Sequence, residues 1–385
     1  MKKKLSILSL ALILMLSALP ALPITAAAAA APKTAVYVDK DNHSFIPLRF
    51  LNGFDGIQAG VGGQTGKEIT ISKNGASVVL ASGQAAALVA GKSVKLSERP
   101  FSSNGTTYVP LSLISQTLDI QLVWNKNAAS LTLASGDASA TLPVLSGALI
   151  PATSPAVVSS RNTYKVGGRS FAVQMVTVPL LHPAVKLDVV LAGNTVGKTE
   201  ALGSIAKRSG AAAAINGTFF DAYTDGAYKA PYGYIISGGK MLKNSPGDKR
   251  TVFAYDDNLL AELIPGSEFM EHFNSGAVTG AIQAGPRLLV DGKVALNVAA
   301  EGFRDPKILT GGGSRSALGL TKDHKLILLT SGGATIPQLA QIMKQAGAYQ
   351  AMNLDGGASS GLFYGGHYLT TPGRLISNAL VVKTK

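Results

Sequence analysis

The chain has 385 residues, of which 46% are hydrophobic and only 15% are charged, so it is too apolar for a disordered protein and long enough for two domains. It contains no cysteine, which excludes disulfides, zinc–thiolate sites, iron–sulfur clusters and cysteine nucleophiles. Its formal charge of +13 at pH 7 favours an anionic envelope polymer or surface as a partner. The lysines are scattered and no arginine cluster occurs, so we expect no nucleic-acid partner.

Residues 1–30 have the pattern of a secretory signal peptide. Three lysines, Lys2–Lys4, precede an apolar stretch from Leu5 to Leu22, and Ala26–Ala31 offers small-residue cleavage sites. No later segment approaches the roughly 20 continuous apolar residues that a membrane span needs. We therefore expect a secreted or cell-wall-associated bacterial protein with no transmembrane segment after cleavage.

An internal repeat occupies the next predicted domain, residues 34–134. Ile46–Leu51 is echoed by Val109–Ile114, and Glu68–Ile71 is echoed by Ser130–Leu133. Such a repeat indicates two copies of one supersecondary unit, each a short helix that begins near a proline and is followed by a strand. Asn104-Gly105 between apolar flanks predicts a hairpin turn.

This domain resembles the copper amine oxidase N-terminal-like, or stalk, module of secreted bacterial proteins. The resemblance rests on Tyr108–Leu111 and Val123–Asn125, and it implies a small α+β domain that acts as a spacer or wall adhesin. It implies no copper, because His43 is the only histidine in the stretch. Asp39 and Asp41 begin like a calcium loop, but the following residues replace the required ligand and glycine, so we interpret the segment as a solvated turn.

Residues 135–160 are rich in Ser, Ala, Pro and Thr and predict a linker, which leaves residues 161–385 as the second domain. In this domain a helix is predicted over Ile336–Ala346, capped by Thr335 and ended by Gly347, and another over Thr199–Arg208. We expect an α+β class with a mixed sheet. The strands predicted from apolar runs are Phe171–Val178, Val185–Leu191, Ala211–Ile215, Val252–Tyr255, Leu288–Val290, Ala317–Leu320, Leu326–Leu329 and Ala351–Leu354.

Two segments share a form that points to chemistry. Ala214–Asp221 and Met352–Ser360 each carry an amide and a carboxylate just past a buried strand, where sheets often gather ligands. Glycines after Asp355 would let the backbone approach a ligand and form an anion-binding nest. Arg315, in a glycine-rich run, could add a bidentate phosphate contact. Taken singly, each segment could also be a tight turn with an Asx cap.

Three other site types are disfavoured by the sequence. Gly357–Gly361 matches the G-x-S-x-G nucleophile elbow, but no acidic residue follows Asp355, and His367, the only later histidine, lies in a predicted hairpin. The glycines at 311–313 precede no helical pattern, which argues against a dinucleotide fold. The five histidines show no H-E-x-x-H spacing, so a zinc hydrolase is not expected.

From Tyr164 onward the chain resembles the phosphodiester glycosidase family. The resemblance implies a hydrolase that cleaves the sugar–phosphate bond of a glycosyl-1-phosphodiester, such as a GlcNAc-1-phosphodiester, in envelope glycans or exopolysaccharide. This sequence departs from the family pattern at Thr218 and Ala358, where the family often has glycine. The segments that carry the resemblance are Ala192–Asn194, Thr199-Glu200, Asn216–Asp221, Gly233-Tyr234, Ala284–Pro286, Arg315–Ala317, Asn353–Ser360 and Asn378–Leu380.

The resemblance also implies roles for individual residues. The candidates for nucleophile or general base are three carboxylates, Asp355, Glu200 and Asp221. The candidates for substrate binding are Asn216 and Asn353 for sugar hydroxyls, and Arg315, Gly356, Gly357, Ser359 and Ser360 for the phosphate. Spacing does not settle which carboxylate plays which role, and Glu200 would equally suit a helix start as a structural carboxylate.

No cofactor is required by this interpretation, and a divalent cation at Asp355 or Asp221 is neither demanded nor indicated. Two other functions fit the same sequence. One is a non-catalytic cell-wall or anionic-glycan binding protein, which the basic composition would suit equally well. The other is a phosphodiesterase that cuts on the phosphate side and releases sugar phosphate.

Overall fold

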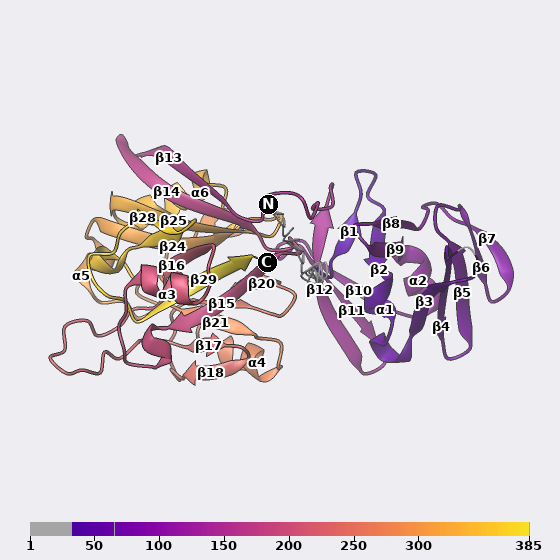
Figure 1. The fold of residues 1–385 in the computed structure, drawn as a ribbon, viewed down its shortest axis with the longest axis horizontal. Coiled ribbons are helices and arrows are strands. Elements are labelled where there is room, and N and C mark those ends of the chain that lie inside the picture. Colours follow the sequence, from indigo (N-terminus) through magenta and orange to yellow (C-terminus); the bar gives the residue numbers. More distant parts are fainter. Residues whose placement is uncertain (1–32, 65, 385) are drawn as a thin grey trace, which may run out of the picture. The chain divides into compact units, whose positions relative to one another are not determined.

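The computed structural model describes residues 33–64 and 66–384 (Figure 1). The predicted signal peptide, residues 1–30, lies outside the described residues. Strands make up about 44% of the structure and helices about 13%, so the expected α+β class is corrected to a mainly β fold with a few short helices. The difference arises because segments that are not apolar runs, such as Ala138–Ser146 and Val158–Val166, are also strands held by pairing, which a local pattern does not reveal.

The N-terminal region contains a seven-stranded and a five-stranded sheet. The first has the order β10-β11-β12-β1-β2-β9-β8 and is mixed, because β1 pairs in parallel with β12. Its strands are β1 (Val36–Val38), β2 (Ser44–Pro47), β8 (Phe101–Ser103), β9 (Thr106–Pro110), β10 (Gln121–Asn125), β11 (Ser130–Ser135) and β12 (Ala138–Ser146). The second consists of β3 (Gln58–Gly62), β4 (Glu68–Lys73), β5 (Ala76–Ala81), β6 (Ala86–Val89) and β7 (Lys92–Lys95).

The predicted repeat is confirmed in this region. Helix α1 (Leu48–Leu51) follows Pro47 and helix α2 (Leu111–Thr117) follows Pro110, and each helix is succeeded along the chain by a pair of antiparallel strands. A short 3-10 turn, η1 (Phe54–Gly56), follows α1. The predicted hairpin turn is also present, since Asn104 and Gly105 have φ angles of 48° and 71° between β8 and β9.

Half of the predicted linker, residues 135–160, is strand. β12 pairs along one edge with β11 and along the other with β1, and β13 begins at Val158, so residues 136–137 and 147–157 lie between strands. Leu142, Val144 and Leu145 are buried in β12. The small and polar residues of this segment indicated a linker because composition does not show the long-range pairing that holds β12 in a sheet.

The C-terminal region contains three sheets whose described strand pairs are all antiparallel. The seven-stranded sheet, in spatial order, is β13 (Val158–Val166), β14 (Arg169–Pro179), β25 (Lys325–Ala334), β24 (Gly313–Leu320), β26 (Gln350–Asn353), β22 (Arg287–Val290) and β23 (Lys293–Val294). The first five-stranded sheet is β15 (Val185–Leu191), β29 (Asn378–Thr384), β16 (Ala213–Asn216), β27 (Leu362–Tyr364) and β28 (His367–Thr370). The second is β18 (Lys240–Lys243), β17 (Ile235–Ser237), β21 (Gly280–Gln283), β19 (Val252–Tyr255) and β20 (Ala261–Ile264).

Short helices cover these sheets. The helical elements of the region are η2 (Ala192–Asn194), α3 (Leu202–Arg208), α4 (Phe269–Asn274), α5 (Pro306–Leu309), α6 (Ile336–Gln345) and η3 (Gly357–Ser359). The prediction for α6 is confirmed, since the Thr335 hydroxyl oxygen accepts a hydrogen bond from the Gln338 amide and the Gln338 side-chain oxygen accepts one from the Thr335 amide.

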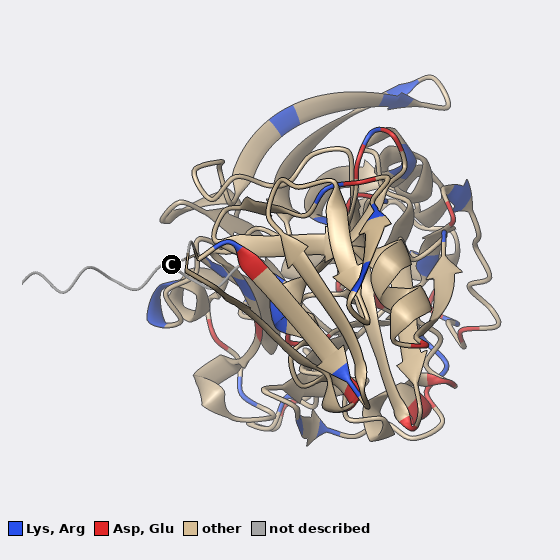
Figure 2. Ribbon diagram, turned by 90° about the vertical axis from the view of Figure 1, so that its right-hand side faces the viewer, with Lys and Arg blue, Asp and Glu red and all other residues tan. Residues whose placement is uncertain are grey.

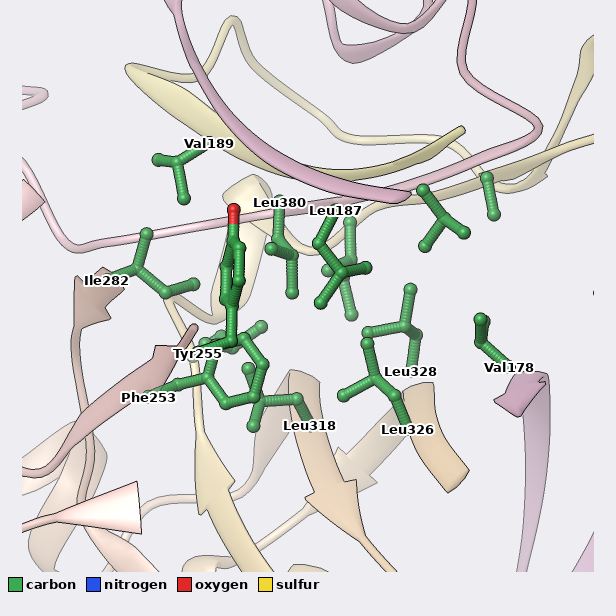
Figure 3. Packing of buried hydrophobic residues seen from close by; sticks show 14 of the residues in the cluster. Val178, Leu187, Val189, Phe253, Tyr255, Ile282, Leu318, Leu326, Leu328 and Leu380 are labelled. Carbon is green, nitrogen blue, oxygen red and sulfur yellow. The ribbon is translucent and has the colours of Figure 1, made fainter. Parts of the chain in front are cut away.

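One hydrophobic core joins the three C-terminal sheets (Figure 3). Side-chain alternation explains the continuous apolar runs in the central strands. In β24 and β25, Leu318 and Leu328 face this core, whereas Ala317 and Leu329 face a second core under α6. Both faces of the sheet are therefore buried, and the loops at its strand ends are held on a rigid support.

Charged residues of both signs are spread over the ribbon and do not gather on one element (Figure 2). Among residues 33–64 and 66–384, none of the helices combines the length and apolar character that crossing a bilayer requires.

Candidate functional site

Two strand ends from different sheets meet in the C-terminal region. β16 ends at Asn216 and β26 ends at Asn353, and each is followed by one of the two segments that the sequence singled out. The Asn216 side-chain Nδ2 donates to the Asp355 backbone carbonyl at 2.7 Å, and the Asp355 amide donates to the Gly217 carbonyl at 3.1 Å. The structure therefore brings together the segments around Asn216 and Asp355.

Asn216 is the anchor of this meeting point. Its Oδ1 accepts hydrogen bonds from Ser316 Oγ at 2.6 Å and from the Gly361 amide at 3.0 Å, in addition to the bond that Nδ2 donates to Asp355. The side chain is buried, so these contacts leave it facing protein and not solvent. Asn216 consequently positions the Asp355 turn. Because its side chain is buried, it cannot make the predicted contact with sugar hydroxyls.

Asn353 anchors the other side of the turn. Its Nδ2 donates to the Gly285 carbonyl at 2.8 Å and to the Leu354 carbonyl at 2.6 Å, and the Gly285 amide returns a bond to the Asn353 carbonyl at 2.9 Å. Because Asn353 is fully buried, it ties the segment after β21 to the end of β26. The buried Asn353 side chain is therefore also inaccessible to a sugar, contrary to its predicted role.

Asp355 is the carboxyl group that these anchors present. Burial raises its pKa to about 7, against the opposing effects of a hydrogen bond from Ser359, the positive charge of Arg374 and the Gly356 amide. No cation forms an ion pair with it among the described residues. A carboxyl group that changes protonation near neutral pH at a strand end has the properties of a general acid or base.

The glycines and serines after Asp355 shape the turn. A Cβ on Gly356 would lie 3.1 Å from the Ser314 carbonyl oxygen, and Gly357 has a φ of +60°, so both positions favour glycine. Gly357 and Ala358 are exposed, whereas Ser359 and Ser360 are buried. In the segment predicted to bind phosphate, the backbone at 357–358 is therefore exposed to solvent, whereas the serine hydroxyls are not.

Arg315 is committed to the protein backbone. Its Nε donates to the Ala334 carbonyl at 3.0 Å, and its Nη2 donates to the carbonyls of Lys307 and Gly311 at 2.7 and 2.8 Å. The residue is buried, and burial lowers the pKa of its guanidinium. It lies beside Gly356, as predicted, but Nε and Nη2 join β24 to the end of β25 and to α5. Only Nη1, the guanidinium nitrogen nearest Gly356, makes none of the described hydrogen bonds, so no two adjacent nitrogens are free for a bidentate phosphate contact.

Glu200 is held in an ion pair. Arg208 Nε and Nη2 donate to the two carboxylate oxygens at 3.0 and 2.9 Å, and the Gly193 amide donates to Oε2 at 2.8 Å. Burial opposes the charge, but Arg208 and the Gly193 amide outweigh it and hold the pKa of Glu200 below its usual value. Of the two interpretations that the sequence left open, this geometry is that of the structural carboxylate.

Asp221 closes a turn. Its Oδ1 accepts a hydrogen bond from the Thr224 amide at 3.2 Å, and its own amide donates to the Ala230 carbonyl at 2.8 Å. These bonds fold residues 221–232 into a loop. None of the hydrogen bonds among the described residues joins Asp221 to Asp355, so the structure does not pair these two carboxylates.

Three residues near the Asp355 turn escaped the sequence analysis. Arg374 Nη2 donates to Tyr223 Oη at 2.8 Å, and the Arg374 guanidinium carbon lies 4.9 Å from the Tyr223 ring centroid. Lys307 Nζ lies 5.9 Å from the same centroid. Tyr223 and Arg374 are 151 positions apart and neither belongs to a motif, so only the fold reveals the cluster.

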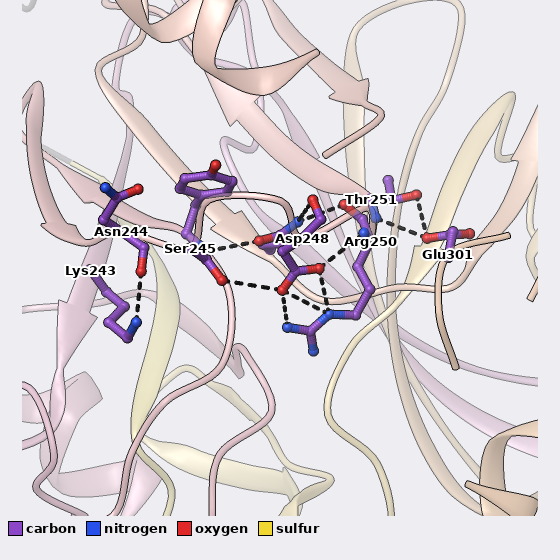
Figure 4. Close-up of polar contacts among 9 residues, drawn as sticks. Lys243, Asn244, Ser245, Asp248, Arg250, Thr251 and Glu301 are labelled. Atoms are coloured by element: carbon purple, nitrogen blue, oxygen red, sulfur yellow. Dashed lines mark hydrogen bonds and ion pairs between the residues drawn. The ribbon is translucent and has the colours of Figure 1, made fainter. Parts of the chain in front are cut away.

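A cavity of about 590 Å³ is lined by residues 247–250 and 299–305, and its lining residue Glu301 lies beside Gly285, a hydrogen-bond partner of Asn353. Figure 4 shows the polar contacts at its wall, where Arg250 forms an ion pair with Asp248 and Glu301 accepts bonds from the Thr251 amide and hydroxyl at 2.8 and 2.9 Å. Arg250 also lies 5.8 Å from the ring centroid of Phe219 in the segment after β16.

One group of His, Asp and Glu residues among the described residues could bring three ligand atoms together, and it consists of Asp39, Asp41 and His43. The Asp39 Oδ1 accepts bonds from the backbone amides of Asp41 and His43 at 2.9 and 2.8 Å, which is the turn that the sequence predicted. Asp355 and Asp221 do not belong to such a group, and a cation at either remains a prediction.

Comparisons with known proteins match two parts of the chain to known families. Residues 209–383 match the model of the phosphodiester glycosidase family, and residues 27–133 match that of the copper amine oxidase N-terminal domain. No curated protein matches the chain.

Two solved structures share the fold. The catalytic domain of zebrafish N-acetylglucosamine-1-phosphodiester alpha-N-acetylglucosaminidase, auto-inhibited by its pro-peptide, is 22% identical over 60% of this chain and 85% of its own, with a TM-score of 0.51. A hypothetical protein from Synechocystis is 16% identical over 92% of this chain and 99% of its own, with a TM-score of 0.53. Residues 209–383 of this chain are thus a phosphodiester glycosidase domain, and residues 27–133 are a copper amine oxidase N-terminal domain.

Proposed function

We propose that this chain is a secreted hydrolase that cleaves the sugar–phosphate bond of a glycosyl-1-phosphodiester, of the GlcNAc-1-phosphodiester type, in envelope glycans or exopolysaccharide. The family match supports a glycosidase-type hydrolase. The observation that carries the proposal is the Asp355 turn, where a carboxyl group with a pKa raised to about 7 by burial lies at the meeting of two strand ends.

The chemistry needs little acid assistance, because a phosphate monoester is already a good leaving group. We assign Asp355 as the general base that takes a proton from water. The water oxygen then bonds to the anomeric carbon, and the bond from that carbon to the phosphate oxygen breaks. The products are a free sugar and a phosphate monoester. A carboxyl pKa near 7 suits this role better than that of a carboxylate nucleophile, which needs to be fully ionised.

The cavity lined by residues 247–250 and 299–305 offers room for the substrate. Its volume of about 590 Å³ falls in the range of small-molecule sites, and one wall carries Phe303, whose ring centroid lies 5.9 Å from that of Phe219. We propose that the sugar and the adjoining part of the polymer occupy this space, with the aromatic pair as an apolar surface. The signal-peptide pattern at residues 1–30 supports export, and the N-terminal domain would then serve as a spacer or wall adhesin.

The test is hydrolysis of a GlcNAc-1-methylphosphodiester in ¹⁸O-labelled water. Cleavage at the anomeric carbon places ¹⁸O in the released GlcNAc and leaves methyl phosphate unlabelled. Release of GlcNAc-1-phosphate carrying ¹⁸O would instead identify the phosphodiesterase alternative. Salt-sensitive wall binding without turnover of any glycosyl phosphodiester would identify the binding-protein alternative, and either result would overturn the proposal.

A further inference from the structure

The arginines around the site differ in how many of their guanidinium N–H donors already have partners within the protein. Arg315 donates to three backbone carbonyls, Arg208 is paired with Glu200, and Arg250 is paired with Asp248. Among the described residues Arg374 has one hydrogen-bond partner, the Tyr223 hydroxyl, and no carboxylate partner. Most of its guanidinium donors therefore remain available to an anion.

Arg374 and Lys307 meet on one aromatic ring. Tyr223 is 76% exposed, and both cations lie within 6 Å of its ring centroid, at the distances given above. The phenol oxygen accepts its bond from Arg374, so its own proton is free to be donated elsewhere. That hydrogen bond lowers the pKa of Tyr223, which makes the phenol a stronger donor.

This cluster is joined to the Asp355 turn by backbone contacts on two sides. The amide of Gly373, the residue before Arg374, donates to the Ala358 carbonyl at 2.7 Å. The Lys307 carbonyl accepts from Arg315, whose side chain lies beside Gly356. The charges of Arg374 and Asp355 also act on each other across the gap. Two loops and helix α5, which are distant in sequence, thus bring together two cations and a phenol, and the charge of Asp355 acts on both Arg374 and Tyr223.

We propose that Arg374, Tyr223 and Lys307 form the anion-binding group of this site and hold the non-bridging oxygens of a phosphodiester beside Asp355. The inference rests on the proposed function and extends it, because it assigns the phosphate to residues outside the motifs and releases Arg315 from that role. Placed around the phosphate, the two cations also stabilise the charge that develops on the leaving phosphate as the bond to the sugar breaks. The group therefore selects a charged leaving group over a neutral one.

The test uses the purified protein and the GlcNAc-1-methylphosphodiester, with Arg374→Met, Arg374→Lys, Tyr223→Phe and Lys307→Met compared with the unaltered chain. We expect kcat/KM to fall about 10- to 100-fold in Arg374→Met, the effect of one lost charged hydrogen bond, with partial recovery in Arg374→Lys. Smaller losses are expected in the other two. The matched control is Arg169→Met, which removes another arginine from an aromatic ring, that of Phe171 at 5.1 Å, and should leave kcat/KM unchanged.

A second measurement separates this inference from the proposed function. In Asp355→Asn, calorimetry with the same phosphodiester and with neutral methyl-GlcNAc reports binding without turnover. Arg374→Met in that background should weaken binding of the phosphodiester at least tenfold and leave binding of methyl-GlcNAc unchanged. Equal binding of the phosphodiester with and without Arg374 would overturn the inference. Absence of turnover by the unaltered chain, combined with Arg374-dependent binding, would overturn the proposed function alone.

Discussion

Two turns of the C-terminal region carry a carboxyl group that the sequence marked as catalytic, and the fold treats them in opposite ways. The Glu200 turn supplies Arg208 and a backbone amide, which neutralise the carboxylate and keep it ionised. The Asp355 turn supplies burial without an ion pair, so its carboxyl group changes protonation near pH 7. The difference teaches that a carboxylate neutralised by its own fold maintains structure, whereas one left without a bonded cation can exchange a proton with a substrate.

The largest effect is expected from removing the reactive carboxyl group. Asp355→Asn should lower kcat for the GlcNAc-1-phosphodiester by about 10²- to 10⁴-fold, the usual contribution of a general base. Asp256→Asn is the matched control, because burial also raises the pKa of Asp256, to about 6, but the residue lies at the β19–β20 turn. Equal loss of activity in the two variants, or full activity in Asp355→Asn, would show that Asp355 is not the general base.

The next effect concerns the anchor of the Asp355 turn. Asn216→Ala leaves the Asp355 carbonyl, the Ser316 hydroxyl and the Gly361 amide without their partner, which should lower the free energy of unfolding by about 3 kcal/mol. Denaturant unfolding measures the loss, and Asn244→Ala at an exposed position serves as the control. A change below about 0.5 kcal/mol would show that the two strand ends do not depend on this side chain.

A pH-dependent stability effect should distinguish the two turns further. The native Asp355 carboxyl keeps its proton up to about pH 7, whereas in the unfolded chain it ionises near pH 4, so the unfolded state binds fewer protons in this interval. The free energy of unfolding should therefore fall as pH rises from 4 through 7. Asp355→Asn should gain about 4 kcal/mol over the unaltered chain at pH 8, because about three pKa units at about 1.36 kcal/mol each separate the two states, and nothing at pH 4. Thermal unfolding at both pH values measures this, and equal stability at pH 8 would contradict it.

The smallest effect is expected at the other turn. Glu200→Gln should lower the free energy of unfolding by about 1 kcal/mol, because its ion pair is partly exposed and screened by solvent, and should change kcat less than about threefold. Arg208→Met should cost a similar amount, and the double variant should cost less than the sum of the two. A loss of activity comparable to that of Asp355→Asn would return Glu200 to the catalytic set.

Local pattern was sufficient for the elements whose signals lie within a few residues. The capping box at Thr335, the Asn104-Gly105 turn and the strand Val252–Tyr255 all appear where the sequence predicts them. Pairing between distant strands has no such local signal, which is why the sequence indicated a linker where β12 lies and an α+β class where the fold is mainly β.

The candidate site shows the same division. The motifs correctly brought Asn216 and Asp355 together, because each follows a buried strand and the strand ends meet. The motifs did not show which of these side chains are available to a substrate. Asn353 and Arg315 instead hold the turn, because backbone carbonyls that accept their hydrogen bonds lie nearby in the fold. The Tyr223–Arg374 contact joins two loops without a motif and could be found only in three dimensions.

Direct titration of the two carboxyl groups tests the central contrast. In protein labelled with ¹³C at Asp Cγ and Glu Cδ, with Asp355→Asn and Glu200→Gln used to assign the signals, Asp355 should titrate near pH 7 and Glu200 below its ordinary value. An Asp355 signal that titrates near pH 4, or a Glu200 signal that titrates near neutrality, would contradict the account.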